Sequence, residues 1–160
     1  MKAILLAVAV VFAASAFAQE STLELLRQDL KTQKVAIMTV SFPLTEAQAE
    51  KFWPIYRDYD NELSKLGDRR MAVLKKYAAS YDKPSEELAE ELVEESFSIA
   101  DDRLDLLEKY YKKVSKAIGP IPAARFMQIE NQLLTLIDAQ IVDEVPLVKI
   151  PGAAGESKKK

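Results

Sequence analysis

The segment SEELAEELVEESFSIADDRLDLLEKYYKKVSKAI, residues 85–118, decides the fold. Its apolar residues recur at alternating spacings of four and three, which places them along one face of an α-helix. The repeat predicts a single continuous helix, roughly 50 Å long at 1.5 Å per residue. A compact globule of this chain's size would be only about 35–40 Å across. The sequence therefore predicts an elongated protein. The residues of this apolar face are Val93, Phe97, Ala100, Leu104, Leu107, Tyr111, Val114 and Ile118.

Three further helices are predicted around this segment. The first covers residues 22–40 and ends before Pro43, because a proline disfavours helical geometry in the residue that precedes it. The second begins after Thr45 and extends to about residue 81, and the last follows the Gly119-Pro120 break and ends near residue 142. The predicted fold class is all-α, an elongated helical hairpin of about four helices.

The second helix is predicted to be kinked at Pro54. Proline has no N–H to donate to the carbonyl of Glu50, and its ring crowds that carbonyl, at a cost of roughly 3 kcal/mol. We expect either a kink at residues 52–54 or a short helix followed by a long one. In an antiparallel hairpin that turns near residues 82–85, Arg69 and Arg70 would lie near Glu94, Glu95 and Asp101, and Asp58 would lie near Lys109.

The N-terminus has the pattern of a secretory signal peptide. A lysine precedes an apolar run over residues 3–14, and small residues precede Gln19 at the positions typical of cleavage. Cleavage after Ala18 would leave 142 of the 160 residues, with 21 basic and 25 acidic side chains. We expect residues 19–145 to form one all-helical domain in the periplasm, not spanning the membrane, and residues 146–160 to form a disordered tail.

Composition excludes several chemistries. The chain has no histidine and no cysteine, which removes Ser-His-Asp and thiol catalysis, imidazole or thiolate metal sites and disulfides. Its mildly acidic charge does not suggest a nucleic-acid partner, and no glycine-rich phosphate loop is present. We expect no enzyme activity, no cofactor and no metal site. The six glutamates between Glu86 and Glu95 match the helix dipole and a solvated face, and whether they also bind cations is left open.

An aromatic group in the second helix is the candidate partner-binding surface. The default interpretation of aromatic residues at helical spacing is core packing. A long, thin hairpin cannot bury every apolar side chain, however, and surplus apolar surface usually marks an interface. Trp53 lies off the stripe of its neighbours and is the best candidate for such a surface. The full candidate set is Phe52, Trp53, Tyr56 and Tyr59.

The sequence LTEAQ, residues 44–48, carries a family resemblance. Thr45 can cap a helix while Gln48 reaches back to the backbone of Thr45, which is a capping box. The same residues match the LTxxQ motif of the Spy/CpxP-like periplasmic proteins, and the predicted helical layout is similar to theirs. Residues 52–70 and 125–149 also resemble a group of secreted helical proteins with this motif. The second LTxxQ copy of many relatives is absent, and residues 121–125 occupy its place.

The resemblance implies an ATP-independent chaperone or envelope-stress protein, usually a homodimer, in which Leu44, Thr45 and Gln48 fix a bend. It implies that the protein binds unfolded or partner proteins through an apolar cradle, which we place near residues 52–59. The alternative is a structural or adaptor protein whose exposed stripe serves a homodimer or one dedicated partner. Because the chain has no histidine, the zinc sites of some relatives are not inherited.

Overall fold

The computed structural model describes residues 32–149, and every regular element in that range is an α-helix. The predicted all-α fold is therefore confirmed. The predicted signal peptide and the start of the predicted first helix lie outside the described residues. The chain divides into two units, Met1–Pro43 and Leu44–Lys160. In the first unit, residues 32–41 are helical, and the helix ends just before Phe42-Pro43, as the sequence predicts.

The second unit begins with α2 (Glu46–Ser80), which starts at the predicted capping box. The Thr45 hydroxyl accepts a hydrogen bond from the backbone N–H of Gln48 at 3.3 Å, and the Gln48 side chain accepts one from the Thr45 N–H at 3.0 Å. Two N–H groups that the helix end leaves without carbonyl partners are thus satisfied. The helix continues through Pro54, so the predicted alternative of two separate helices is wrong. Pro54 has no N–H to donate to the carbonyl of Glu50. Both residues are exposed, so water can reach this carbonyl.

A short turn leads into α3 (Glu86–Ile118), and Gly119 leads directly into α4 (Pro120–Glu144). Ser85 caps α3 by accepting from the N–H of Leu88 at 3.2 Å. Gly119 has φ +99°, a conformation that favours glycine, and its N–H donates to the carbonyl of Ser115 at 3.0 Å. Pro120 occupies the first turn of α4, where no N–H is needed. Ser85 and Gly119 thus flank the two ends of α3, and each end lies within one residue of the predicted position.

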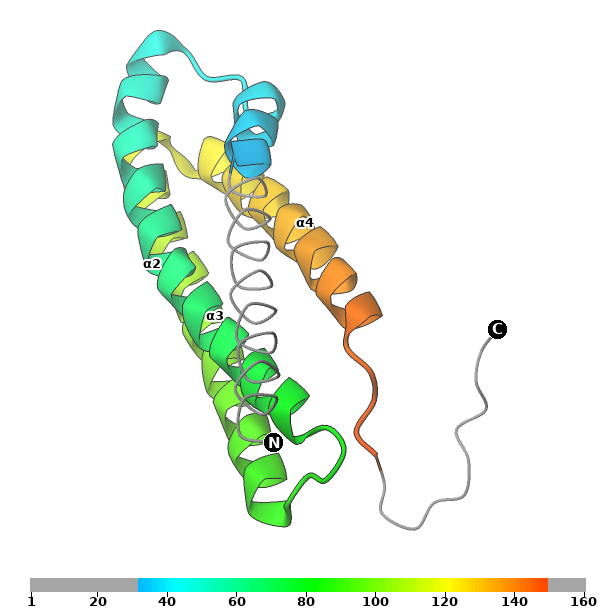
Figure 1. Ribbon diagram of the computed structural model, residues 1–160. Helices are drawn as coiled ribbons and strands as arrows, with labels where there is room; N and C mark the ends of the chain where they lie inside the picture. Colours follow the sequence, from blue (N-terminus) through cyan, green and yellow to red (C-terminus); the bar gives the residue numbers. More distant parts are fainter. Residues whose placement is uncertain (1–31, 150–160) are drawn as a thin grey trace, which may run out of the picture. The chain divides into compact units, whose positions relative to one another are not determined.

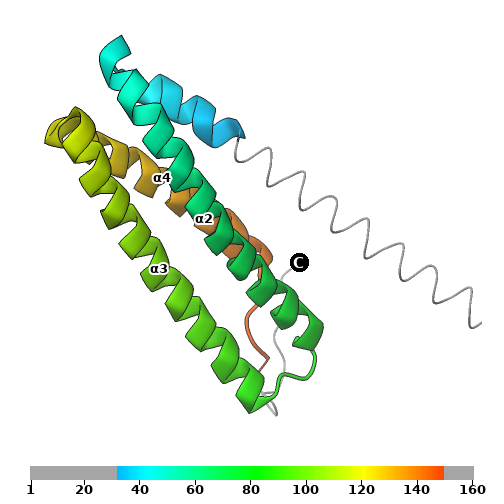
Figure 2. The same ribbon diagram turned by 90° about the vertical axis from the view of Figure 1, so that its left-hand side faces the viewer.

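In the second unit, α2 and α3 lie side by side and α4 packs on α3 (Figures 1 and 2). Within these three described helices, no Cα atoms of α2 and α4 approach within 8 Å. Long side chains span the distance instead. Phe126 of α4 meets Phe52 and Tyr59 of α2, with ring centroids 5.8 and 5.6 Å apart. The core of this unit is therefore a layer of aromatic rings that holds α2 and α4 together without backbone proximity.

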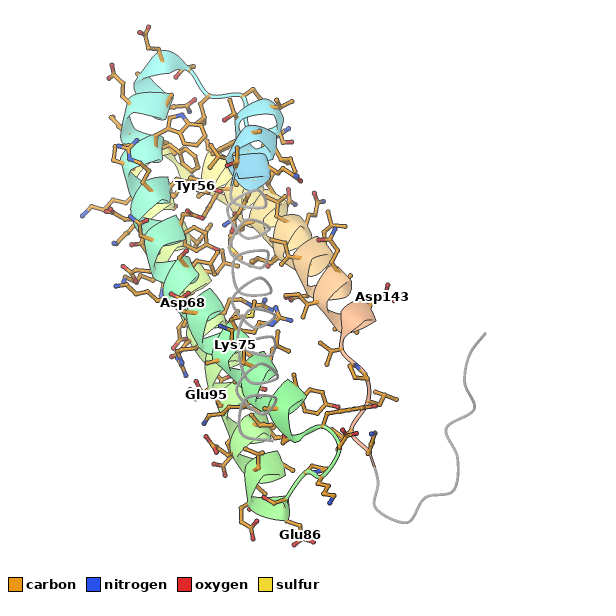
Figure 3. The ribbon with its side chains drawn as sticks, viewed as in Figure 1. Tyr56, Asp68, Lys75, Glu86, Glu95 and Asp143 are labelled. Atoms are coloured by element: carbon orange, nitrogen blue, oxygen red, sulfur yellow. The ribbon has the colours of Figure 1, made fainter. Side chains whose placement is uncertain are left out.

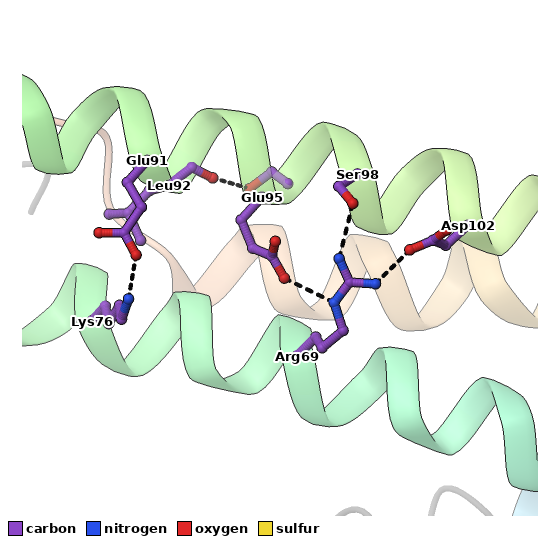
Figure 4. A network of polar contacts seen from close by, with 8 residues as sticks. Arg69, Lys76, Glu91, Leu92, Glu95, Ser98 and Asp102 are labelled. Carbon is purple, nitrogen blue, oxygen red and sulfur yellow. Dashed lines mark hydrogen bonds and ion pairs between the residues drawn. The ribbon is translucent and has the colours of Figure 1, made fainter.

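The hairpin of α2 and α3 has the predicted antiparallel register, but two of the predicted ion pairs have other partners. Arg69 pairs with Glu95 at 2.8 Å and also contacts Asp102 (Figure 4). Arg70 instead pairs with Asp138 of α4, 68 residues away. The partner of Lys109 is Glu62, one helical turn from the predicted Asp58.

Residues 146–149, the start of the predicted tail, contact the α2–α3 turn. The hydroxyl of Tyr77 donates to the carbonyl of Pro146 at 2.7 Å, and Lys149 pairs with Asp82. The ammonium of Lys149 also lies 4.3 Å from the ring centroid of Tyr81. The remainder of the predicted tail lies outside the described residues.

Candidate functional site

Three of the four predicted partner-binding residues are core residues. Phe52, Tyr56 and Tyr59 are buried. Tyr56 and Tyr59 pack against Phe126 of α4, and Tyr59 also meets Tyr110 of α3 at 5.3 Å. Figure 3 shows Tyr56 on the inner side of α2, directed toward the other helices. The prediction that these rings form an exposed cradle is wrong, because the layer between α2 and α4 needs side chains of this length.

Trp53, the fourth predicted residue, is half-buried at the edge of the same layer. Its ring makes edge contacts with Phe52 at 5.2 Å and Tyr56 at 5.7 Å. Edge-to-face pairs of this kind stabilise a protein beyond the area that they bury. Trp53 therefore extends the aromatic core to the surface and does not stand apart from it.

The interior environment keeps the buried tyrosines protonated. Burial raises the pKa of Tyr56 and of Tyr59 well above the ordinary value of 10, because a phenolate loses its hydration there. The negative charge of Glu130 raises both pKa values further. These hydroxyls are therefore neutral at any physiological pH and serve the structure.

Exposed large apolar residues of this unit lie on α3, on α4 and after it, and those of α3 are in line on one helix face. Val93, Phe97 and Leu104 are 53%, 68% and 66% exposed, and Ala100 between them is also exposed. These four residues, at spacings of four, three and four, share one helix face and are called the α3 stripe below. Single exposed apolar residues are ordinary. Three large ones in line on one face are a candidate contact surface.

The α3 stripe is the first part of the apolar face that the sequence places on this helix, and the helix period explains why this part is exposed. A seven-residue repeat drifts by about 20° per heptad on a straight helix of 3.6 residues per turn. The buried face of α3 is formed by Ile99, Leu106, Leu107, Tyr110 and Val114. Over the predicted stripe the drift brings Leu107 and Val114 onto this buried face while Phe97 remains outside it. The exposure of Phe97 could therefore have been predicted from the difference between the 3.5-residue period of the repeat and the 3.6 residues per turn of the helix.

The acidic residues of α3 fall into two sets with different partners. Glu91, Glu95 and Asp102 face α2 and pair with Lys76 and Arg69 (Figure 4). A second, exposed set lies beside the α3 stripe: Glu90, Glu94, Asp101 and Asp105, called the acidic rim below. Within residues 32–149 these four carboxylates form no ion pair or hydrogen bond of their side chains.

Sequence order places the acidic rim on one side of the stripe. Glu94, Asp101 and Asp105 each directly follow a stripe residue, so each lies about 100° further around the helix in the same direction. Glu90 lies one turn before Glu94 on that side. The opposite side of the stripe leads to Ile99, which is buried, and to Arg103, which pairs with Asp138 at 2.9 Å. The stripe thus has the core on one side and uncompensated negative charge on the other.

A groove of about 400 Å³ lies between α2 and α3, next to the acidic rim. Its cationic side chains are already engaged. Arg69 donates to Glu95, Asp102 and Ser98, the last at 2.9 Å, and Lys76 pairs with Glu91. Because of these bonds, Glu95 has a lowered pKa and Arg69 a raised one. A ligand in the groove would have to displace interactions that join the two helices.

The described residues contain no cluster of three or more acidic side chains arranged to hold a metal ion. Of the glutamates in residues 86–95, Glu91 and Glu95 pair with α2, whereas Glu90 and Glu94 belong to the acidic rim. Among residues 32–149 no helix has the length and apolar character required to cross a bilayer.

Comparison of the chain with known protein families, with curated proteins and with solved structures found no match. The resemblance to the Spy/CpxP-like proteins therefore rests on residues 44–48 and the helical layout, together with the similarity of residues 52–70 and 125–149 to secreted helical proteins with this motif. The structure shows what the motif residues do in this chain: Thr45 and Gln48 form the reciprocal cap of α2, and the half-buried Leu44 precedes it.

Proposed function

We propose that this protein is a non-catalytic, ATP-independent binding protein of the periplasm that holds unfolded or partly unfolded polypeptides on the α3 stripe. The observation that carries the proposal is the exposure of Val93, Phe97 and Leu104 along one face of α3, beside faces that pack against the core or pair with α2 and α4. The signal-peptide pattern of residues 1–18 supports the location. The LTxxQ resemblance supports a chaperone-like role.

The mechanism is reversible burial of apolar surface. An unfolded segment exposes apolar side chains to water, and transferring them onto the stripe releases about 25 cal/mol for each Å² removed from water. Because the stripe is narrow and lies on the convex surface of a single helix, contact is shallow and no fixed binding geometry is imposed. Shallow contact of this kind suits many different sequences and permits release without ATP.

The test is suppression of aggregation with a matched pair of double variants. Purified residues 19–160 should reduce light scattering of several unrelated unfolding proteins at stoichiometric amounts. The variant F97S/L104S should lose most of this effect, because it removes the two most exposed side chains of the stripe. The control I121S/L136S changes residues of α4 that are 83% and 63% exposed, and it should retain the effect.

Two results would contradict the proposal. Absence of suppression by the wild-type chain would exclude general binding of unfolded proteins and leave an adaptor with one dedicated partner. Equal loss in both double variants, at unchanged stability, would show that total exposed apolar area matters and the α3 stripe does not.

A further inference from the structure

The charge next to the α3 stripe distinguishes among polypeptides that could bind there. Between Glu86 and Glu108 the sequence holds ten acidic residues and a single basic one, Arg103. Arg103 is engaged by Asp138 on the core side of the stripe. The acidic carboxylates that face α2 are compensated by Arg69 and Lys76, whereas the acidic rim has no such compensation within the described helices. A segment lying on the stripe would therefore meet negative charge along one whole side of it.

We propose that the α3 stripe binds cationic amphipathic segments, meaning stretches of polypeptide in which lysine or arginine side chains flank apolar ones. This inference rests on the proposed function and adds the class of client. Apolar side chains of the segment would cover Val93, Phe97 and Leu104 while its cations lie beside Glu94, Asp101 and Asp105. Opposite charges at an interface steer association and select partners more than they add affinity.

A second copy of the chain fits this face poorly. Two identical helices that meet across a two-fold axis in antiparallel orientation bring the same flank of each helix together. The acidic rim of one copy would then face the acidic rim of the other, and like charges across an interface oppose association. The same negative charge opposes docking on a membrane rich in anionic lipids. A cationic polypeptide is the occupant that the charges favour.

The experiment compares three fluorescent peptides with identical apolar residues and with lysine, glutamine or glutamate at the flanking positions. Binding to residues 19–160 is followed by fluorescence anisotropy at low and at physiological ionic strength. We expect the lysine peptide to bind about tenfold tighter than the glutamine peptide at low salt, from three surface charges of modest individual effect, and the difference to shrink as salt is added. The glutamate peptide should bind most weakly.

Two triple variants with the same change in net charge distinguish the effect of the acidic rim from the effect of total charge. E94Q/D101N/D105N should bring the affinity for the lysine peptide close to that for the glutamine peptide and leave glutamine-peptide binding unchanged. The control E50Q/D58N/D143N makes the same change in net charge at exposed positions of α2 and α4 and should preserve the preference.

Each alternative outcome has a distinct meaning. Equal binding of the three peptides, or equal effects of the two triple variants, would overturn the inference and leave the proposed function intact. Absence of binding by any peptide would contradict the proposed function itself. Self-association that F97S removes, measured by sedimentation, would assign the stripe to a second copy. Binding to phosphatidylglycerol vesicles in preference to the lysine peptide would assign it to a membrane.

Discussion

Phe126 and Phe97 offer the same residue in two environments, and truncating each to alanine tests which surfaces form the core. Phe126 is fully buried, with the rings of Phe52, Tyr56 and Tyr59 within 5.6–6.3 Å of its own. Removing a buried phenylalanine ring loses its transfer free energy and leaves a cavity, which together cost about 3–5 kcal/mol. No backbone of α2 lies close enough to α4 to fill the space. We therefore expect F126A to lie at the upper end of that range.

The same truncation at Phe97 should be almost neutral. The residue is 68% exposed, so only about a third of the 1.5–3 kcal/mol of a fully buried side chain is at stake, or roughly 0.5–1 kcal/mol. Alanine recovers about half a kcal/mol of this through its higher helix propensity. The expected net change in the free energy of unfolding is within about 0.5 kcal/mol.

Urea unfolding followed by circular dichroism at 222 nm measures both variants against the parent chain. The m-value, the dependence of the unfolding free energy on urea, should be unchanged in F97A, so that its midpoint reports stability directly. A loss of 2 kcal/mol or more in F97A would show that the α3 stripe is core in solution and would refute the assignment of faces. A loss below 1 kcal/mol in F126A would refute the aromatic layer.

Three further predictions concern local features. T45A removes the side-chain half of the capping box and should lower the free energy of unfolding by about 1 kcal/mol in the same urea assay, whereas T45S should retain it. G119A should lower the free energy of unfolding by about 1–3 kcal/mol, because φ +99° with ψ 160° is strained for any residue with a Cβ. The added Cβ would lie 3.8 Å from Pro122 Cδ, an ordinary contact, so the loss comes from the backbone alone. An unchanged stability would show that the helix junction can relax. Hydrogen bonds from Lys109 and Tyr110 lower the pKa of Glu62, so the stability that this group contributes is full above the ordinary glutamate pKa of about 4.3 and is lost as the pH falls below it. E62Q should therefore reduce the dependence of the melting temperature on pH between pH 5 and 3. An equal slope in both proteins would contradict this role of Glu62.

The helix boundaries could be predicted because their signals are local. Thr45, Ser85 and Gly119 act on groups within four residues of themselves, and the structure shows Thr45 and Gly119 performing the predicted roles. The pairing of Arg69 with Glu95 could also be predicted, because the position of the α2–α3 turn fixes the register. Pro54 remained inside one helix because the carbonyl left without a donor lies on the exposed side.

The candidate surface could not be predicted in the same way, because it depends on where α4 packs. Nothing in the sequence near Arg70 indicates that its partner is Asp138, which is 68 residues away. Likewise, the aromatic spacing of Phe52, Tyr56 and Tyr59 identifies a face of α2 but does not say that α4 covers it. Once α4 is in place, these rings are interior and Phe97 is exposed. The candidate binding surface therefore lies on α3 and not on α2.

The most direct test of the central claim is to map where an unfolded protein touches the chain. A photoreactive benzophenone amino acid is placed singly at Phe97, Leu104, Ile121 or Leu136, all exposed positions, and each protein is irradiated with an unfolding client. Binding on the α3 stripe predicts adducts at Phe97 and Leu104 and few at Ile121 and Leu136. Equal yields at all four positions, or adducts confined to Ile121 and Leu136, would contradict it.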